Sequence, residues 1–186
     1  MKIFINPGHA PNGEPDPGAC NMDTGLRESD VTAAISEKVV EQLQTAGYEV
    51  QTLQSDSLTE VVNSANCWPA DIFISIHCNA CNSVAQGTET CVFSSYDAQL
   101  DYVETRARKL GECIQAQIVT ALGTTDRGLK PHTPGKNGLY VLTETNMPAV
   151  LIETAFIDQE DDEKLLAERQ DDFAAAIAQG VADYAA

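Results

Sequence analysis

Two short apolar runs constrain the fold of this chain more than any other feature. Residues 71–76 and 149–152 are almost continuously apolar and have the length of single strands. Such runs are typical of strands that are buried on both faces, as in a parallel sheet with helices on either side. Neither run approaches the roughly 20 apolar residues that a membrane-spanning helix needs. We therefore expect an α/β fold and no membrane span.

The rest of the chain alternates between strand and helix patterns, without a linker long enough to divide it. Further strands are predicted at residues 2–6, 48–53, 87–94 and 139–142. Helices are predicted from Asp30 as N-cap to Ala46, and at residues 58–65, 98–122 and 158–184. Residues 10–29 and 127–138 are rich in glycine and proline and are predicted loops. This alternation predicts one domain with a twisted, mostly parallel sheet covered on both faces.

The charge balance excludes several kinds of partner. The 186 residues contain 11 Lys and Arg against 28 Asp and Glu, a formal net charge of −17. Nucleic acid, anionic lipid and anionic wall polymers would be repelled by this charge rather than attracted. The first residues enter a strand pattern directly, without the apolar segment of a signal peptide. We expect either a protein made without a signal or an excised catalytic domain.

The six cysteines are too few for a disulfide scaffold, because they make up about 3% of the chain. We expect most of them to be reduced and packed. Cys78 and Cys81 form a Cys-x-x-Cys pair that could be redox-active or half of a zinc site. No second pair of this kind is present to complete a site of four thiolates.

Metal-binding side chains occur where predicted strands end. His9 follows the first strand, His77 follows residues 71–76, and Glu153 follows residues 149–152. The carboxyl ends of strands in open α/β sheets meet where ligands bind. A catalytic zinc site uses three protein ligands and one open position. The two histidines supply two ligands, and Glu28, at the same end of the sheet, fits best as the third.

Each of these residues also has a structural interpretation. A single strand-end histidine can simply be a satisfied structural residue. An acid at the end of a buried strand, such as Glu153, is costly unless it is paired or used. It would act as a general base toward water, or it would cap the turn into the next helix. Arg127 could bind a substrate carboxylate or pair locally with Asp126, and His132 could contact substrate or stay exposed in its loop.

Several motifs together resemble the zinc-dependent N-acetylmuramoyl-L-alanine amidases of the amidase-3 type. The match extends from Ile3 to the C-terminus, and the motifs occur in the family's order. They are Ile5-Asn6-Pro7-Gly8-His9, Asp16-Pro17-Gly18-Ala19, Gly25-Leu26-Arg27-Glu28, Ser75-Ile76-His77-Cys78-Asn79-Ala80, Gly87-Thr88-Glu89-Thr90 and Pro148-Ala149-Val150-Leu151-Ile152-Glu153. The resemblance implies a single three-layer α/β/α domain over residues 1–186.

The same resemblance implies a set of roles. His9, Glu28 and His77 would hold one Zn²⁺ ion, and Glu153 would be the general base. Asn79, Arg127 and His132 are expected substrate contacts. Glu14, in a segment longer than the family's, could compete for the metal. The inserted helix that blocks the site in autoinhibited members has no counterpart between residues 89 and 127, so we expect an open cleft.

The implied activity is hydrolysis of the amide bond between N-acetylmuramic acid and L-alanine of the peptidoglycan stem peptide. Two alternatives stay open, a zinc peptidase or amidase acting on another substrate and a catalytically silent wall-binding module. We expect a monomer that acts outside the cytoplasm, on the cell wall. With a charge of −17, wall targeting would need a separate binding module, a partner or specific contacts in the cleft. Host enzyme and phage lysin are both compatible with the sequence.

Overall fold

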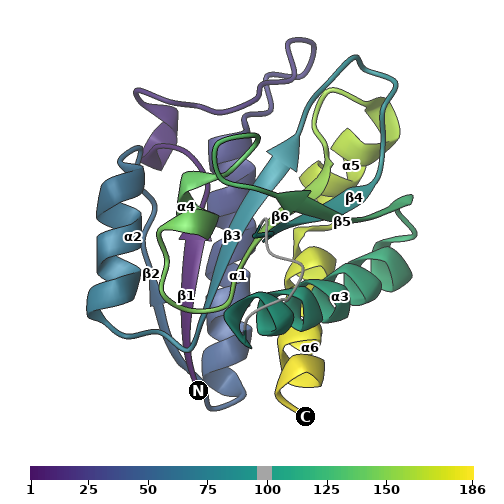
Figure 1. The fold of residues 1–186 in the computed structure, drawn as a ribbon. Coiled ribbons are helices and arrows are strands. Elements are labelled where there is room, and N and C mark those ends of the chain that lie inside the picture. The colour runs from purple at the N-terminus through teal and green to yellow at the C-terminus, as the bar shows by residue number, and fades with distance from the viewer. Residues whose placement is uncertain (96–101) are drawn as a thin grey trace.

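The computed structural model describes residues 1–95 and 102–186, which form one six-stranded sheet with helices on both faces (Figure 1). The sheet order is β2-β1-β3-β6-β4-β5. The strands are β1 (Lys2–Pro7), β2 (Glu49–Thr52), β3 (Ile72–Asn79), β4 (Thr88–Phe93), β5 (Asp126–His132) and β6 (Ala149–Phe156). The first four strands in this order are parallel, β4 runs antiparallel to β6, and β5 is parallel to β4. The mostly parallel sheet is therefore confirmed.

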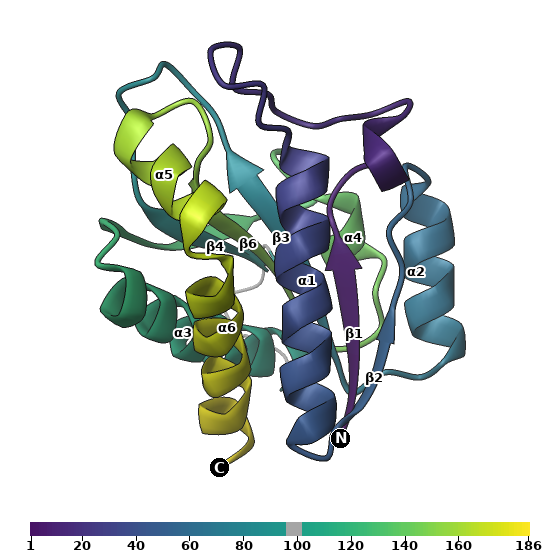
Figure 2. The ribbon, with the colours of Figure 1, turned by 180° about the vertical axis from the view of Figure 1, so that it is seen from behind.

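The helices divide unequally between the two faces of the sheet (Figures 1 and 2). One face is covered by α1 (Glu28–Thr45), α3 (Tyr102–Leu122), α5 (Glu160–Glu168) and α6 (Gln170–Ala185). Among the described residues, the other face carries only α2 (Leu58–Cys67) and the single turn α4 (Tyr140–Thr143). A short 3₁₀ turn, η1, spans Pro11–Gly13. No helix within the described ranges is long and apolar enough to cross a membrane.

Strand alternation explains why both faces are apolar. In β3, Ile72, Ile74 and Ile76 are fully buried beneath α1, α3 and α6. Phe73 points to the opposite face, where its ring stacks on that of Phe4 at a centroid distance of 5.8 Å. Successive side chains of a strand point to opposite faces, so a continuous apolar run serves two cores. Ser75 and His77 share the face of Phe73, and this sparsely covered face is where polar groups gather.

Helix α1 begins three residues earlier than the sequence predicts, because its N-cap is Arg27 and not Asp30. The Arg27 carbonyl accepts hydrogen bonds from the backbone N–H groups of Asp30 and Val31. Asp30 is therefore inside the first turn, where an acid favours the helix dipole and pairs with the Arg27 side chain at 2.7 Å. The correction matters because it makes Glu28 the first residue of the helix.

Three other predictions about local structure are wrong in part. Residues 126–132 form the edge strand β5 rather than a loop, because they pair with β4. Pro131 is compatible with this strand, since an edge strand has one unpaired side. Residues 139–142 lie at the helical turn α4 rather than in a strand, and it buries Val141 and Leu142. The C-terminal helix is interrupted at Arg169. The start of the helix predicted over 98–122 lies partly outside the described residues.

Candidate metal centre and active site

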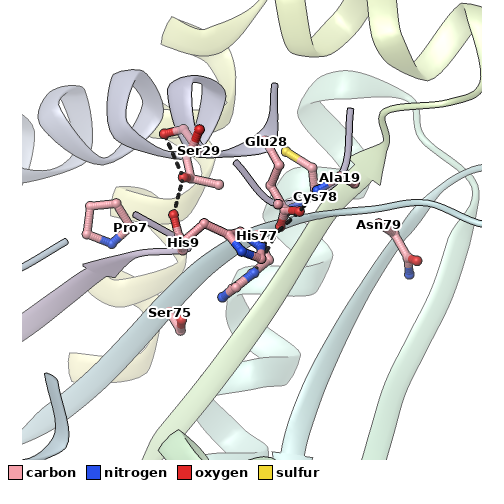
Figure 3. A network of polar contacts seen from close by, with 12 residues as sticks. Pro7, His9, Ala19, Glu28, Ser29, Ser75, His77, Cys78 and Asn79 are labelled. Carbon is pink, nitrogen blue, oxygen red and sulfur yellow. Dashed lines mark hydrogen bonds and ion pairs between the residues drawn. The ribbon is translucent and has the colours of Figure 1, made fainter. Parts of the chain in front are cut away.

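Three metal-competent side chains from three separate elements converge at one edge of the sheet (Figure 3). His9 lies in the turn after β1 and Glu28 is the first residue of α1. His77 lies within β3 and not after it as the sequence suggests, because the strand continues to Asn79. One ligand atom of each lies within 4.8 Å of those of the other two. The structure thus brings together the three residues that the sequence suggests as metal ligands.

The Glu28 carboxylate bridges the two histidines. Its Oε1 lies 2.9 Å from His77 Nδ1, and its Oε2 lies 2.9 Å from His9 Nε2. Backbone N–H groups of Cys78 and Ala19 donate to the same two oxygens at 2.9 and 2.8 Å. Glu28 is almost completely buried, at 4% exposure, so these four contacts fix its position.

His9 is oriented by a second carboxylate on its far side. Asp16 Oδ2 lies 2.8 Å from His9 Nδ1, and Asp16 Oδ1 accepts from the Gly18 backbone N–H at 3.0 Å. A carboxylate behind a histidine is the usual means of fixing which ring nitrogen faces a metal. The His9 backbone has a φ of +66°, a conformation that costs energy for a residue with a side chain.

Two glycines leave room for the imidazole rings. A Cβ on Gly8 would lie 2.4 Å from His77 Cε1. A Cβ on Gly18 would lie 2.5 Å from His9 Cδ2 and 2.6 Å from Glu28 Oε2. Real Cβ atoms do not approach other heavy atoms this closely, so any larger residue would displace a candidate ligand. The Pro-Gly-His and Asp-Pro-Gly segments therefore have a steric reason for their glycines.

The cluster changes the protonation of its members. Burial alone lowers the pKa of His9, but the Glu28 and Asp16 carboxylates outweigh it and raise that pKa to about 9. Burial raises the pKa of Glu28, but its hydrogen bonds to His77 and His9 prevail and hold it well below its usual range. The pKa of Asp16 is lowered, chiefly by its hydrogen bond to His9. A cation bound here would take the place of the proton on His9.

Glu153 lies beside this cluster. It is the register partner of His77 on the neighbouring strand β6, within the strand rather than after it as the sequence suggests. Its Oε2 is buried and has no hydrogen-bond partner among the described residues. Burial is the main cause that raises the pKa of Glu153 to about 7. An unpaired carboxylate with this pKa is suited to exchanging a proton near neutral pH.

Glu89 is a residue of the site that the sequence interpretation missed. It is the register partner of Glu153 across the antiparallel β4–β6 pair. Glu89 Oε1 accepts from Asn79 Nδ2 at 3.0 Å, and Glu89 Oε2 accepts from Arg127 Nε at 2.7 Å. Arg127 therefore pairs with Glu89 and not with its neighbour Asp126. The sequence feature that could have indicated Glu89 is its position as the one acidic residue in the strand Thr-Glu-Thr-Cys-Val-Phe.

Two further candidates lie apart from the triad. His132 is level with Phe93, four positions along β4 from Glu89, and its Nδ1 contacts the Asn137 carbonyl. Four positions correspond to roughly 13 Å along a strand, so the structure does not bring His132 to Glu153. Glu14 is exposed and is not in the cluster formed by His9, Glu28 and His77.

A cavity of about 310 Å³ opens next to the two histidines. Its walls come from β1, β3, β6 and the segments around α2 and α4. It is lined by Asn6, Gly8, His9, Asp16, Ser55, Asp56, Leu58, His77, Leu139, Tyr140, Val141 and Leu151. A small molecule or polymer segment bound there would touch the metal-binding side chains directly.

All six cysteines lie in the described residues and are free thiols. Cys78 is buried and Cys81 is exposed, so they do not form one exposed pair. Burial raises the pKa of the Cys78 thiol well above its ordinary value. This environment disfavours the thiolate that redox chemistry or metal binding would require.

Comparison with known proteins gives the family. Residues 3–183 match the Amidase_3 family, described as N-acetylmuramoyl-L-alanine amidase. The chain is 36% identical over 98% of its length to the uncharacterized protein YqiI of Bacillus subtilis, covering 84% of that protein. It is 37% identical to the N-acetylmuramoyl-L-alanine amidase LytC of the same organism, with 98% of this chain and 35% of LytC covered. The chain belongs to the N-acetylmuramoyl-L-alanine amidase family, a family of cell-wall hydrolases.

A solved structure supports the same assignment for the fold. An N-acetylmuramoyl-L-alanine amidase from Clostridium difficile 630 superposes with a TM-score of 0.82 at 31% identity. The superposition covers 99% of this chain and 96% of that one. The α/β architecture of this chain is thus that of a solved amidase structure over nearly its whole length.

Proposed function

We propose that residues 1–186 form one catalytic domain that hydrolyses the amide bond between N-acetylmuramic acid and L-alanine of peptidoglycan. In this proposal His9, Glu28 and His77 hold one zinc ion and Glu153 is the general base. The observation that carries the proposal is the adjacency of two groups. A three-ligand cluster lies next to a carboxylate whose buried Oε2 has no partner among the described residues.

The donor set fits zinc. Two imidazoles and one carboxylate are one of the ligand combinations of catalytic zinc sites, which keep a further position open. Gly8 and Gly18 leave the space that the His77 and His9 rings occupy beside Glu28. Asp16 supports His9 from behind, as second carboxylates do at many metal sites.

The proton transfers belong to Glu153. When bound, zinc supplies Lewis acidity toward the scissile carbonyl and lowers the pKa of water. Glu153 takes a proton from the attacking water and returns it to the nitrogen of the departing L-alanine. Its burial favours this exchange, because a desolvated carboxylate gains more from accepting a proton than an exposed one.

Asn79 and Arg127 are the substrate contacts we retain in this proposal. Asn79 lies at the end of β3, two residues after His77, and holds Glu89 in place. His132 is level with the start of β6, away from the triad, and has no role in the reaction as we propose it.

The setting follows from the substrate. Peptidoglycan lies outside the cytoplasm, so we propose that the domain acts there. We also propose that it acts as a monomer. Its charge of −17 provides no general attraction to an anionic wall. Wall targeting would then come from a separate module, a partner or contacts within the cleft.

The experiment is a product analysis on two substrates, a muramoyl-L-alanyl peptide and the same peptide without the sugar. Cleavage of the first alone, with a new free amine on L-alanine, is the expected result. Cleavage inside the plain peptide would instead identify a zinc peptidase with this fold. A zinc-loaded protein that cleaves neither would contradict the proposed activity.

A further inference from the structure

A row of charged side chains lies on the same sheet face as Glu153, toward the edge strand β5. Glu89 faces Glu153 across β4 and β6. Lys130 is the register partner of Cys91, two residues beyond Glu89, so it shares the face of Glu89. Arg127 joins this row through its 2.7 Å contact with Glu89.

The Arg127 guanidinium is held in a defined position. Its central carbon lies 4.8 Å from the centroid of the Phe156 ring. Phe156 is buried in β6 and is the register partner of Asn79, two residues beyond His77. The guanidinium therefore lies over β6 just past the metal-binding cluster. Stacking on the ring together with the Glu89 contact fixes its plane.

The terminal amino groups of Arg127 are available to bind a ligand. Among the described residues, Arg127 Nη1 and Nη2 donate no hydrogen bond, and the side chain is 33% exposed. Lys130 Nζ donates to the Arg127 carbonyl at 2.8 Å and lies 3.9 Å from Glu89, with 39% of its side chain exposed. A guanidinium held in this way, with two amino groups that donate no hydrogen bond within the described residues, can donate paired hydrogen bonds to a carboxylate.

The two sides of the metal-binding cluster differ in charge. On the β5 side, the cationic side chains of Arg127 and Lys130 lie next to Glu89. On the opposite side, the cavity next to the histidines is lined by Asp16 and Asp56 and, within the described residues, by no Lys or Arg. An extended substrate with one neutral and one anionic half is therefore favoured in one direction only.

We propose that Arg127 and Lys130 form an anion-binding subsite for a free carboxylate on the stem-peptide residue that follows L-alanine. The inference rests on the proposed amidase function and adds the direction of the substrate, with the sugar on the side of the cavity and the peptide toward β5. The distance from the base to the proposed subsite fits a short peptide. Strand β5 is two strands from β6, roughly 10 Å away. An extended peptide covers roughly 3.5 Å per residue.

The test uses two muramoyl-L-alanyl peptides that differ at one group. The residue after L-alanine carries a free carboxylate in one and a carboxamide in the other. We expect the wild-type chain to prefer the carboxylate by about tenfold or more in kcat/KM. Arg127→Met and Lys130→Met should each reduce this ratio. Lys38→Met, which removes a lysine paired with Asp171 on the opposite face, should keep it.

The ratio separates a binding role from a structural one. If Arg127 only neutralises Glu89, its loss lowers activity on both substrates equally and the ratio stays constant, which would overturn the subsite. Equal kcat/KM of the wild-type chain on both substrates would overturn it as well. A wild-type chain that cleaves neither substrate would overturn the amidase function and the subsite together.

Discussion

His77 and Glu153 are register partners on the parallel strands β3 and β6. A candidate ligand and the candidate base therefore project from neighbouring positions of one rigid sheet. Their spacing does not depend on a loop, so substrate does not need to assemble the pair. This relationship separates metal binding from proton transfer, since only His77 belongs to the three-ligand cluster.

Replacing the base should stop the reaction without releasing the metal. We expect Glu153→Gln to lower kcat by a factor of about 10²–10⁴. Its zinc content should equal that of the wild-type chain, because Glu153 is not a candidate ligand. Parallel measurement of kcat and bound zinc checks this. The exposed Glu160, paired with Lys164 on α5, provides the control Glu160→Gln. Activity of Glu153→Gln near that of the control would remove Glu153 from its role.

The steric role of Gly18 can be isolated with a matched glycine. Gly18 and Gly25 both have a positive φ, +68° and +78°, so alanine costs about 1 kcal/mol of backbone strain at either position. Only at Gly18 would the new Cβ meet His9 and Glu28, at 2.5 and 2.6 Å. We expect Gly18→Ala to weaken zinc affinity by about 10- to 100-fold. Gly25→Ala should bind zinc normally, and equal affinities in a chelator competition would contradict the steric account.

Metal-free protein should lose stability as the pH rises from 6.5 to 9. The pKa of His9 rises from 6.5 to about 9 on folding, because its carboxylate partners outweigh burial. A histidine whose pKa is higher in the folded state stabilises the fold fully at a pH below its pKa in the unfolded chain. This contribution is lost as the pH rises through its pKa in the folded chain. We expect the free energy of unfolding to fall by up to about 3 kcal/mol. Urea unfolding in chelator measures it.

The variant His9→Gln provides the control for this pH dependence. Without the titrating imidazole, the decrease between pH 6.5 and 9 should become much smaller. Zinc-loaded protein should also lack the decrease, because the ion replaces the proton. A wild-type, metal-free chain whose stability is constant or increases over this range would show that His9 is not held by Glu28 and Asp16.

Much of the fold and of the metal site can be predicted from the sequence, for a physical reason. Apolar runs and the four-residue spacing of apolar side chains along α1 predict which residues are buried. The residues with this spacing are all buried: Val31, Ile35, Val39 and Leu43. His9 and His77 were suggested by strand ends, which local pattern reveals. The resemblance to the amidases supplied most of the case for Glu28.

Other features depend on contacts between distant segments and leave no local pattern. The Glu89–Arg127 pair joins β4 to β5, 38 residues apart. The glycine and proline of β5 gave the sequence a loop character, although pairing with β4 makes it a strand. The sequence predicts a strand at α4, because four apolar and aromatic residues are too few to distinguish the period of a helix from that of a strand.

Close packing of α3 against α6 gives a prediction about stability alone. A Cβ on Gly180 of α6 would lie 2.6 Å from Ile114 Cα in α3. Alanine gains about 1 kcal/mol over glycine in a helix, but an overpacked backbone contact costs about 1–3 kcal/mol. We therefore expect Gly180→Ala to destabilise the fold in chemical unfolding. Gln179→Ala, on the exposed side of the same helix, should change it by less than about 0.5 kcal/mol.

The most direct test of the central claim is the zinc content of the purified chain, measured with muramoyl-peptide hydrolysis before and after chelation. The account predicts about one zinc ion per chain, loss of activity on chelation and recovery when zinc is returned. His9→Gln and His77→Gln should each lower both zinc content and activity. A folded chain that binds no zinc when supplied with it would contradict the account, because His9, Glu28 and His77 would then be a structural cluster.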